Sequence, residues 1–276
     1  MGKKPNELKM FLPDYWASTR IGNFTKIKHP IFSRIIGKPE NTHLSYTLDE
    51  FNKLLKQITE SNGSNVSGLR IYFISYPAEP NPDLIPSGME DTLSLIYAPT
   101  KIALSDGKII HVNTGDYFVK DAKNNIINLN GDVTTVKNWI QNFETRKRNI
   151  INKLLFQGQD YETQSLWYEI DTIEDAYLFL TNSDGNSKDI PPIIAIFFAT
   201  YHLDEREKAI AGIAKQYHDK LTLIFSFMSL GNIDGTPYYY YVNSGDNDDI
   251  HALGGSGDTG VPCPPPPSGQ TTCPGA

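Results

Sequence analysis

One arginine stands inside an otherwise apolar stretch and is the sharpest candidate for binding chemistry in this chain. Arg70 lies within a run of aromatic and β-branched residues typical of a strand, and alternation places it on one face with Tyr72 and Tyr76. A buried guanidinium without a partner is very costly, so Arg70 needs one. The sequence leaves two partners open: a ligand carboxylate or phosphate, or an acidic residue of the same core.

More polar candidates follow in the next strand and the turn after it. His111 lies in a predicted strand, and the turn from Asn113 to Asp116 could present amides and a carboxylate to a ligand. A tight turn after a strand selects the same residue types, so the turn also has a purely structural explanation. The candidate ligand-binding residues are therefore Arg70, Tyr72, Tyr76, His111, Asn113 and Asp116.

Motifs of familiar enzymes are absent from the sequence. It contains no His-Glu-x-x-His pair, no Gly-x-Ser-x-Gly elbow and no phosphate-binding Walker loop. Its two cysteines, Cys263 and Cys273, lack the spacing of a structural zinc site. We therefore expect no metal and no cofactor, and the sequence leaves open whether the protein is an enzyme.

The charge of the chain argues against nucleic acid as a partner. The net charge is −7, and the longest basic cluster, Arg146-Lys147-Arg148, is short and lies in a helical pattern, which predicts a solvated face. No apolar run has the length of a signal peptide or a membrane span, so we expect no membrane partner and a cytoplasmic location.

An internal repeat organises the chain. The strand at residues 71–76 recurs at 196–201, and the segment at 93–98 recurs at 221–226. Two more matches keep this order: residues 46–51 with 168–173, and residues 112–116 with 242–246. Four collinear matches with nearly constant spacing indicate a tandem duplication. The alternative explanation is convergent strand composition.

The elements around these matches predict an α+β fold with two tandem repeated units, each with helices packed on a small, mainly antiparallel sheet. The units are expected at residues 1–125 and 126–251, followed by a disordered Gly/Pro-rich tail at 252–276 that joins neither sheet. Residues 69–76 read as a central strand, Asp106-Gly107 as a hairpin turn, and Thr47 with Glu50 as a helix capping box. Pro30 and the Gly37-Lys38-Pro39 cluster are expected to break the chain after the first helix.

The pattern also resembles an uncharacterised family of small Bacteroidota-type bacterial proteins. The matching motifs are Gly-Leu-Arg-Ile-Tyr-Phe at residues 68–73, the strand running into Pro-Thr at 95–100, Leu-Trp-Tyr at 166–168, and the tail with Cys263-Pro264-Pro265 and Cys273. The resemblance implies two such units in tandem and carries no activity. Ala195 departs from it, because it stands where the second copy should have the arginine.

These observations support only a general expectation about function. We expect a non-catalytic interaction or binding protein whose partner is an unknown protein or small molecule. The alternative is a small-ligand sensor or an unfamiliar enzyme that uses the Arg70 face of the first repeat.

Overall fold

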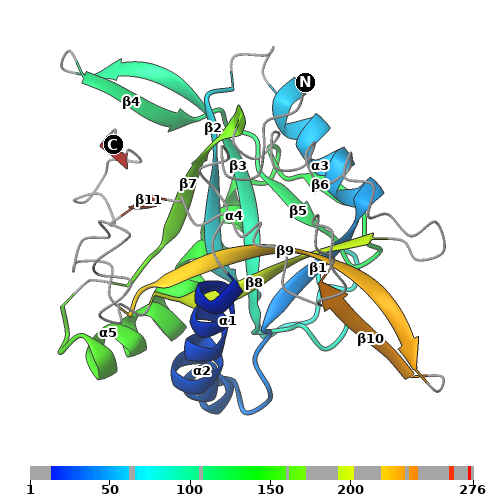
Figure 1. Cartoon of the computed structure of the whole chain (residues 1–276). Helices are drawn as coiled ribbons and strands as arrows, with labels where there is room; N and C mark the ends of the chain where they lie inside the picture. Colours follow the sequence, from blue (N-terminus) through cyan, green and yellow to red (C-terminus); the bar gives the residue numbers. More distant parts are fainter. Residues whose placement is uncertain are drawn as a thin grey trace. The chain divides into compact units, whose positions relative to one another are not determined.

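The structure is a computed structural model that describes residues 14–61, 66–105, 108–159, 162–171, 192–201, 219–233, 236–241, 261–263 and 273–274. The chain divides into two compact units. Figure 1 labels the helices and strands. Unit 1 comprises residues 1–26, 42–52 and 171–260, and unit 2 comprises residues 27–41, 53–170 and 261–276. Each compact unit therefore takes residues from both of the repeat units expected from the sequence.

Unit 1 is built on a four-stranded sheet, here called sheet A. Its strands are β1 (His43–Thr47), β8 (Pro192–Thr200), β9 (Leu221–Ile233) and β10 (Thr236–Tyr241), in the order β1-β8-β9-β10. Helix α1 (Asp14–Asn23) packs its Ala17 and Ile21 against Ala199 and Ile224 of this sheet. Small and β-branched side chains at this contact allow the helix to lie close to the strands.

Unit 2 is built on a larger sheet, here called sheet B. Its main path runs β11-β7-β2-β3-β4-β12, and β5 and β6 branch from β3. The strands are β2 (Gly68–Ser75), β3 (Leu93–Ser105), β4 (Lys108–Asn113), β5 (Phe118–Lys120), β6 (Ile126–Asn128), β7 (Ser165–Glu169), β11 (Val261–Cys263) and β12 (Cys273–Pro274). Every strand pair within the described residues is antiparallel, which confirms the predicted α+β class with antiparallel sheets.

The described part of unit 2 also contains four helical elements, of which α4 (Val133–Phe143) packs on strand β2. The four are α2 (His29–Ile36), α4, the π-helical turn η3 (Glu144–Arg148) and α5 (Asn149–Leu155). Helix α4 places Val136 and Trp139 on the face formed by Tyr72, Ile74 and Tyr76. Two further elements have residues in both units: the π-helical turn η2 (Phe24–Lys28) and helix α3 (Leu48–Glu60).

Three local predictions are confirmed. Strand β2 lies between β7 and β3, so it is central, as its apolar faces indicated. The β3–β4 pair is a hairpin in which Ser105 lies opposite Lys108. At the start of α3, the backbone N–H of Glu50 donates to Thr47 Oγ1 at 3.2 Å, and the N–H of Thr47 donates to Glu50 Oε2 at 2.8 Å. This reciprocal exchange is the predicted capping box.

The prediction that Pro30 breaks the chain after the first helix is wrong. After the π-helical turn η2, Pro30 lies in the first turn of α2. Turn η2 ends two residues before Pro30 and departs from the α-helical hydrogen-bond pattern, so the proline falls where that pattern is already interrupted. The helical path ends at Gly37, whose φ of 72° is left-handed, as the Gly37-Lys38-Pro39 cluster indicated.

The prediction of a solvated basic face at residues 146–148 is also wrong. Lys147 and Arg148 are buried, and only Arg146 is partly exposed. The cluster lies in the π-helical turn η3, and the extra residue in such a turn changes which side chains face the sheet. The interior carboxylate that accepts Lys147 is described below.

Part of the tail joins sheet B, contrary to the sequence prediction. Strand β11 pairs with β7, where Pro262 lies opposite Leu166, and β12 pairs with β4, where Cys273 lies opposite His111. Both are edge strands, and an edge strand tolerates proline because one side of its backbone needs no partner. The other residues of the expected disordered tail lie outside the described part of the chain.

The described helices are all too short or too polar to cross a membrane.

Candidate functional site

Arg70 shares one face of sheet B with several polar and aromatic residues of neighbouring strands. On β2, Arg70 lies opposite Trp167 of β7 and Ala98 of β3. Residues directly opposite one another in an antiparallel pair project to the same side of the sheet. The next paired positions on that side bring in Thr100 and Asn113. We call this side of sheet B the Arg70 face.

The structure brings four of the six predicted site residues into one hydrogen-bond network. Arg70 donates through one terminal nitrogen to Asn113 Oδ1 at 3.3 Å and through the other to the carbonyl of His111 at 3.0 Å. The Asn113 amide donates to the hydroxyl of Tyr72 at 2.8 Å. The Arg70 side chain is 2% exposed, and these two contacts are with a side-chain amide and a backbone carbonyl.

A tryptophan that sequence reasoning did not assign to the site completes this network. The indole N–H of Trp167 donates to Thr100 Oγ1 at 3.0 Å, and its ring lies 4.2 Å from the His111 ring, centroid to centroid. A Cβ atom on Gly68 would come within 2.5 Å of the indole, so only glycine leaves room for it. A glycine inside an apolar strand was the available sequence signal for this close approach.

Burial and charge hold His111 in its neutral form. Its pKa lies below the ordinary value of 6.5 because burial disfavours the imidazolium, and the nearby Arg70 adds repulsion that Glu169 partly offsets. The ring Nδ1 lies 3.0 Å from Ser67 Oγ, so the neutral ring has a hydrogen-bonding partner. A proton on this ring would add a second positive charge beside the arginine.

This pKa shift predicts a pH dependence of stability. Because the folded pKa is lowered, the unfolded chain takes up the proton first as the pH falls below 6.5, and stability decreases until the pH passes the folded pKa. A titration of the His111 ring by NMR should give a pKa below 6.5. His111→Gln should lose less stability than the native chain between pH 7 and pH 5, and a ring pKa of 6.5 or higher would contradict the prediction.

The other two predicted site residues have separate contacts. Tyr76 accepts a hydrogen bond from Ser94 Oγ at 3.0 Å under helix α4, and burial raises the pKa of its phenol. Asp116 accepts hydrogen bonds from Ser61 Oγ and from the Asn128 amide, the latter at 2.8 Å. Burial acts to raise the pKa of Asp116, but these and similar hydrogen bonds outweigh it and keep the pKa low. Tyr76 and Asp116 thus have contacts typical of structural residues.

Beyond the polar network, the Arg70 face continues onto an exposed apolar surface. The outer ends of β3 and β4 form a hairpin arm (Figure 1), and β12 pairs with β4 at Ile110 and His111. On this arm Ile102 lies opposite His111, and Leu104 lies opposite Ile109, so all three apolar side chains share the side of the network. Their exposed fractions are 59% for Ile102, 75% for Leu104 and 58% for Ile109. We call these three residues the arm face.

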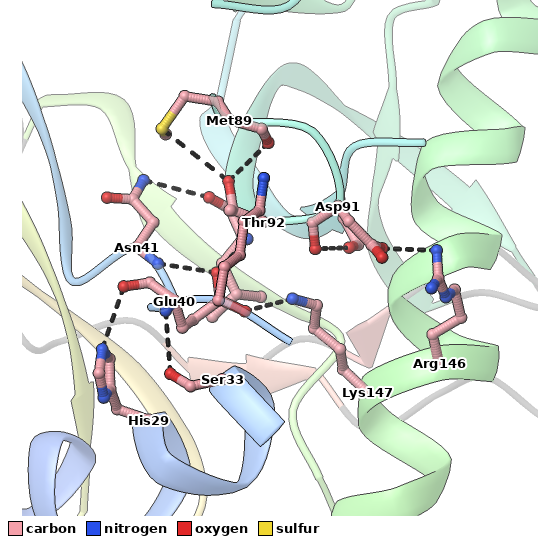
Figure 2. A network of polar contacts seen from close by, with 12 residues as sticks. His29, Ser33, Glu40, Asn41, Met89, Asp91, Thr92, Arg146 and Lys147 are labelled. Atoms are coloured by element: carbon pink, nitrogen blue, oxygen red, sulfur yellow. Dashed lines mark hydrogen bonds and ion pairs between the residues drawn. The ribbon is translucent and has the colours of Figure 1, made fainter. Parts of the chain in front are cut away.

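A second polar cluster in unit 2 surrounds Glu40 (Figure 2). Lys147 forms an ion pair with Glu40, and both side chains are 0% exposed. The other carboxylate oxygen of Glu40 accepts the backbone N–H groups of Asn41 at 2.8 Å and Leu93 at 2.7 Å. Burial lowers the pKa of Lys147, while Glu40 acts in the opposite direction. The ion pair is out of reach of any ligand in this structure.

An equivalent pair lies elsewhere in the same unit. Lys28 forms an ion pair with Glu162, again with both side chains 0% exposed. Sequence reasoning missed all four residues, although Lys28 and Lys147 recur at nearly the spacing of the repeat, as do Glu40 and Glu162. That recurrence was the signal that could have identified them.

The described residues contain no group of three or more His, Cys, Asp or Glu side chains arranged to hold a metal ion. Comparison with known proteins adds no assignment. No family model matches the chain, and no curated protein or solved structure is detectably similar to it.

Proposed function

We propose that this chain is a non-catalytic protein-binding module and that it binds through the arm face and the adjoining His111–Trp167 pair. The observation that carries the proposal is the exposure of three large apolar side chains on one side of the β3–β4 hairpin arm. Large apolar side chains scattered singly over a surface are ordinary, whereas a contiguous group marks a binding surface. The neighbouring aromatic pair extends the same surface with ring faces.

The partner that fits this surface is a short apolar segment of another polypeptide. Three apolar side chains and two rings form one small patch, which a short segment can cover. A stable dimer of two copies needs about 800 Å² from each partner, which the arm face is too small to supply alone. The net charge of −7 argues against nucleic acid.

The alternative expected from the sequence, a ligand site on Arg70 itself, has less support. The guanidinium is 2% exposed and already hydrogen-bonded to Asn113 and the His111 carbonyl. A ligand would have to displace these bonds and also reach a nearly buried group. We therefore assign Arg70 the role of fixing the strand from which His111 projects.

A photo-crosslinking experiment tests the proposed surface. A photoreactive amino acid replaces Leu104 in cells, and a matched chain carries it at Ser105, the exposed neighbour on the opposite side of β3. A protein crosslinked through position 104 is then purified and its affinity measured. Leu104→Asp should weaken binding at least tenfold, since it places a charge in an apolar contact, whereas Ser105→Asp should leave the affinity within twofold.

Two outcomes would overturn this assignment. Crosslinks from position 104 that join only residues of the same chain would show that the arm face is covered internally. Equal effects of Leu104→Asp and Ser105→Asp on the purified complex would place the contact elsewhere.

We also propose that the chain arose by tandem duplication, within the family that the sequence resembles, and that it works in the cytoplasm. Matched ring contacts support the duplication. Phe24 and Phe198 lie 5.8 Å apart in unit 1, and Phe143 and Phe73 lie 5.9 Å apart in unit 2. Each phenylalanine of one pair corresponds in the repeat to one of the other pair, so the same helix-to-strand contact is made twice.

Backbone details support the duplication as well. The helical segment at the start of each half is interrupted by a π-helical turn, at Phe24–Lys28 and at Glu144–Arg148. Before the second long strand of each half, Asp91 has a φ of 64° and Asp219 has a φ of 61°. A left-handed aspartate is uncommon, so its recurrence at equivalent places argues against chance similarity.

The two sheets differ at the positions of the polar network. Where sheet B pairs Arg70 with Trp167, sheet A pairs Ala195 with Ser45. The position of Tyr72 is taken by Phe197. The Arg70–Trp167 pair and the Tyr72 hydroxyl are therefore absent from the corresponding positions of sheet A.

A further inference from the structure

The short first strand of each half of the chain pairs with the long strand of the other half. We call residues 14–128 the first half and residues 133–241 the second half. Strand β1 of the first half pairs with β8 of the second, and β7 of the second half pairs with β2 of the first. Neither sheet is therefore built from one half alone.

The first helix of each half also packs on the sheet strand of the other half. Helix α1 of the first half packs its Ala17 against Ala199 of β8 in the second half. Helix α4 of the second half packs Trp139 against Tyr76, which follows β2 of the first half, with the ring centroids 5.0 Å apart. Each half thus gives both a helix and a strand to the sheet of the other.

Each of the two buried ion pairs joins a lysine of one half to a glutamate of the other half. Lys28 of the first half pairs with Glu162 of the second, and Lys147 of the second half pairs with Glu40 of the first. In each case the lysine follows the exchanged helix, and the glutamate precedes the exchanged strand. The ion pair therefore connects the end of one half's helix to the start of the other half's strand.

The surroundings of the glutamates are also matched. The backbone N–H of Glu40 donates to Ser33 Oγ at 2.9 Å, and the backbone N–H of Glu162 donates to Asn152 Oδ1 at 2.9 Å. Ser33 and Asn152 occupy equivalent places, five residues after Lys28 and Lys147. A buried charge needs hydrogen bonds and a counter-ion, and both halves meet this need with the same set of groups.

We propose that the chain is a fused, reciprocally exchanged pair, in which each half of the chain is the binding partner of the other and the two lysine–glutamate pairs lock the exchange. The inference rests on the proposed duplication and is independent of the proposed arm-face binding. The experiments below measure association of the two halves and not binding of a partner. A failure of the exchange proposal would therefore leave the arm-face proposal intact, and a failure of the arm-face proposal would leave the exchange intact.

Cleavage between the halves tests the proposal on the full chain. A protease site is inserted between Asn130 and Gly131, two exposed residues ahead of helix α4. After cleavage under native conditions, the two fragments should elute together at the mass of the intact chain and separate only in denaturant. Two folded fragments that elute separately at about half that mass would overturn the exchange.

A double-mutant cycle tests which lysine and glutamate stabilise the association of the two halves. Lys28→Met and Glu162→Gln should each lower the denaturant midpoint, and the double variant should unfold near the midpoint of the worse single variant, because the second change removes a charge that the first had left unpaired. Lys28 and Glu40 belong to the same half and do not pair with each other. The shifts in denaturant midpoint caused by Lys28→Met and Glu40→Gln should therefore be nearly additive. Glutamine keeps the acceptor oxygen that the backbone N–H groups near Glu40 use.

The opposite pattern of coupling, with Lys28 linked to Glu40 and additive with Glu162, would overturn the reciprocal arrangement. If Lys28→Met prevents folding, the cleavage experiment decides alone, since it leaves every side chain native.

Discussion

Replacing Lys147 with methionine is expected to lower the free energy of unfolding by about 3–5 kcal/mol, the usual cost of leaving one member of a buried ion pair without its partner. Glu40 would remain 0% exposed, without its counter-ion and still held by the N–H groups of Asn41 and Leu93. Urea denaturation followed by circular dichroism measures the change.

Two matched variants separate this effect from loss of a lysine as such. Lys137→Met removes an exposed lysine from helix α4 and should change stability by no more than about 0.5 kcal/mol. Lys147→Met combined with Glu40→Gln should recover part of the loss, because no buried carboxylate then stays unpaired. An unchanged urea midpoint for Lys147→Met would show that the ion pair is not formed.

Truncation of Trp139 to alanine should be similarly severe, at about 3–5 kcal/mol, since it leaves a large cavity in the core. Trp139 is 3% exposed, and its ring makes an edge-to-face contact with Tyr76. The contact adds a specific aromatic interaction to the area that the indole buries. Thermal and urea unfolding should both move to milder conditions.

Leu154→Ala is the matched control for this truncation. Leu154 lies on the helix α5 with 62% of its side chain exposed, so its removal should have little effect. Comparable losses for Trp139→Ala and Leu154→Ala would mean that helix α4 does not pack on sheet B as described.

Local features of this fold were readable from the sequence. The Thr47–Glu50 capping box and the β3–β4 hairpin depend on neighbouring residues, so short patterns are sufficient to predict them. The central place of β2 followed from its apolar faces. Four of the six candidate site residues also lie in one network, because strand alternation and the hairpin register put them on one side of the sheet.

Long-range features were not readable in the same way. Alternation shows which side of β1 or β7 is buried but does not name the strand beside it, so the exchange between halves had no signal within either strand. Lys147 lies 107 residues from Glu40 in the chain, and a short basic cluster without a visible partner resembles a solvated surface. Trp167 was overlooked because its space is made by Gly68, a residue of another strand.

The difference between Arg70 with Trp167 in one sheet and Ala195 with Ser45 in the other has a genetic consequence. In a symmetric dimer of identical subunits, one codon change alters both sites at once, so a binding surface cannot be refined on one side without the same change on the other. Under the proposed duplication, joining the two copies in a single reading frame removes that constraint. One sheet is then free to acquire a binding surface while its twin is selected only for folding.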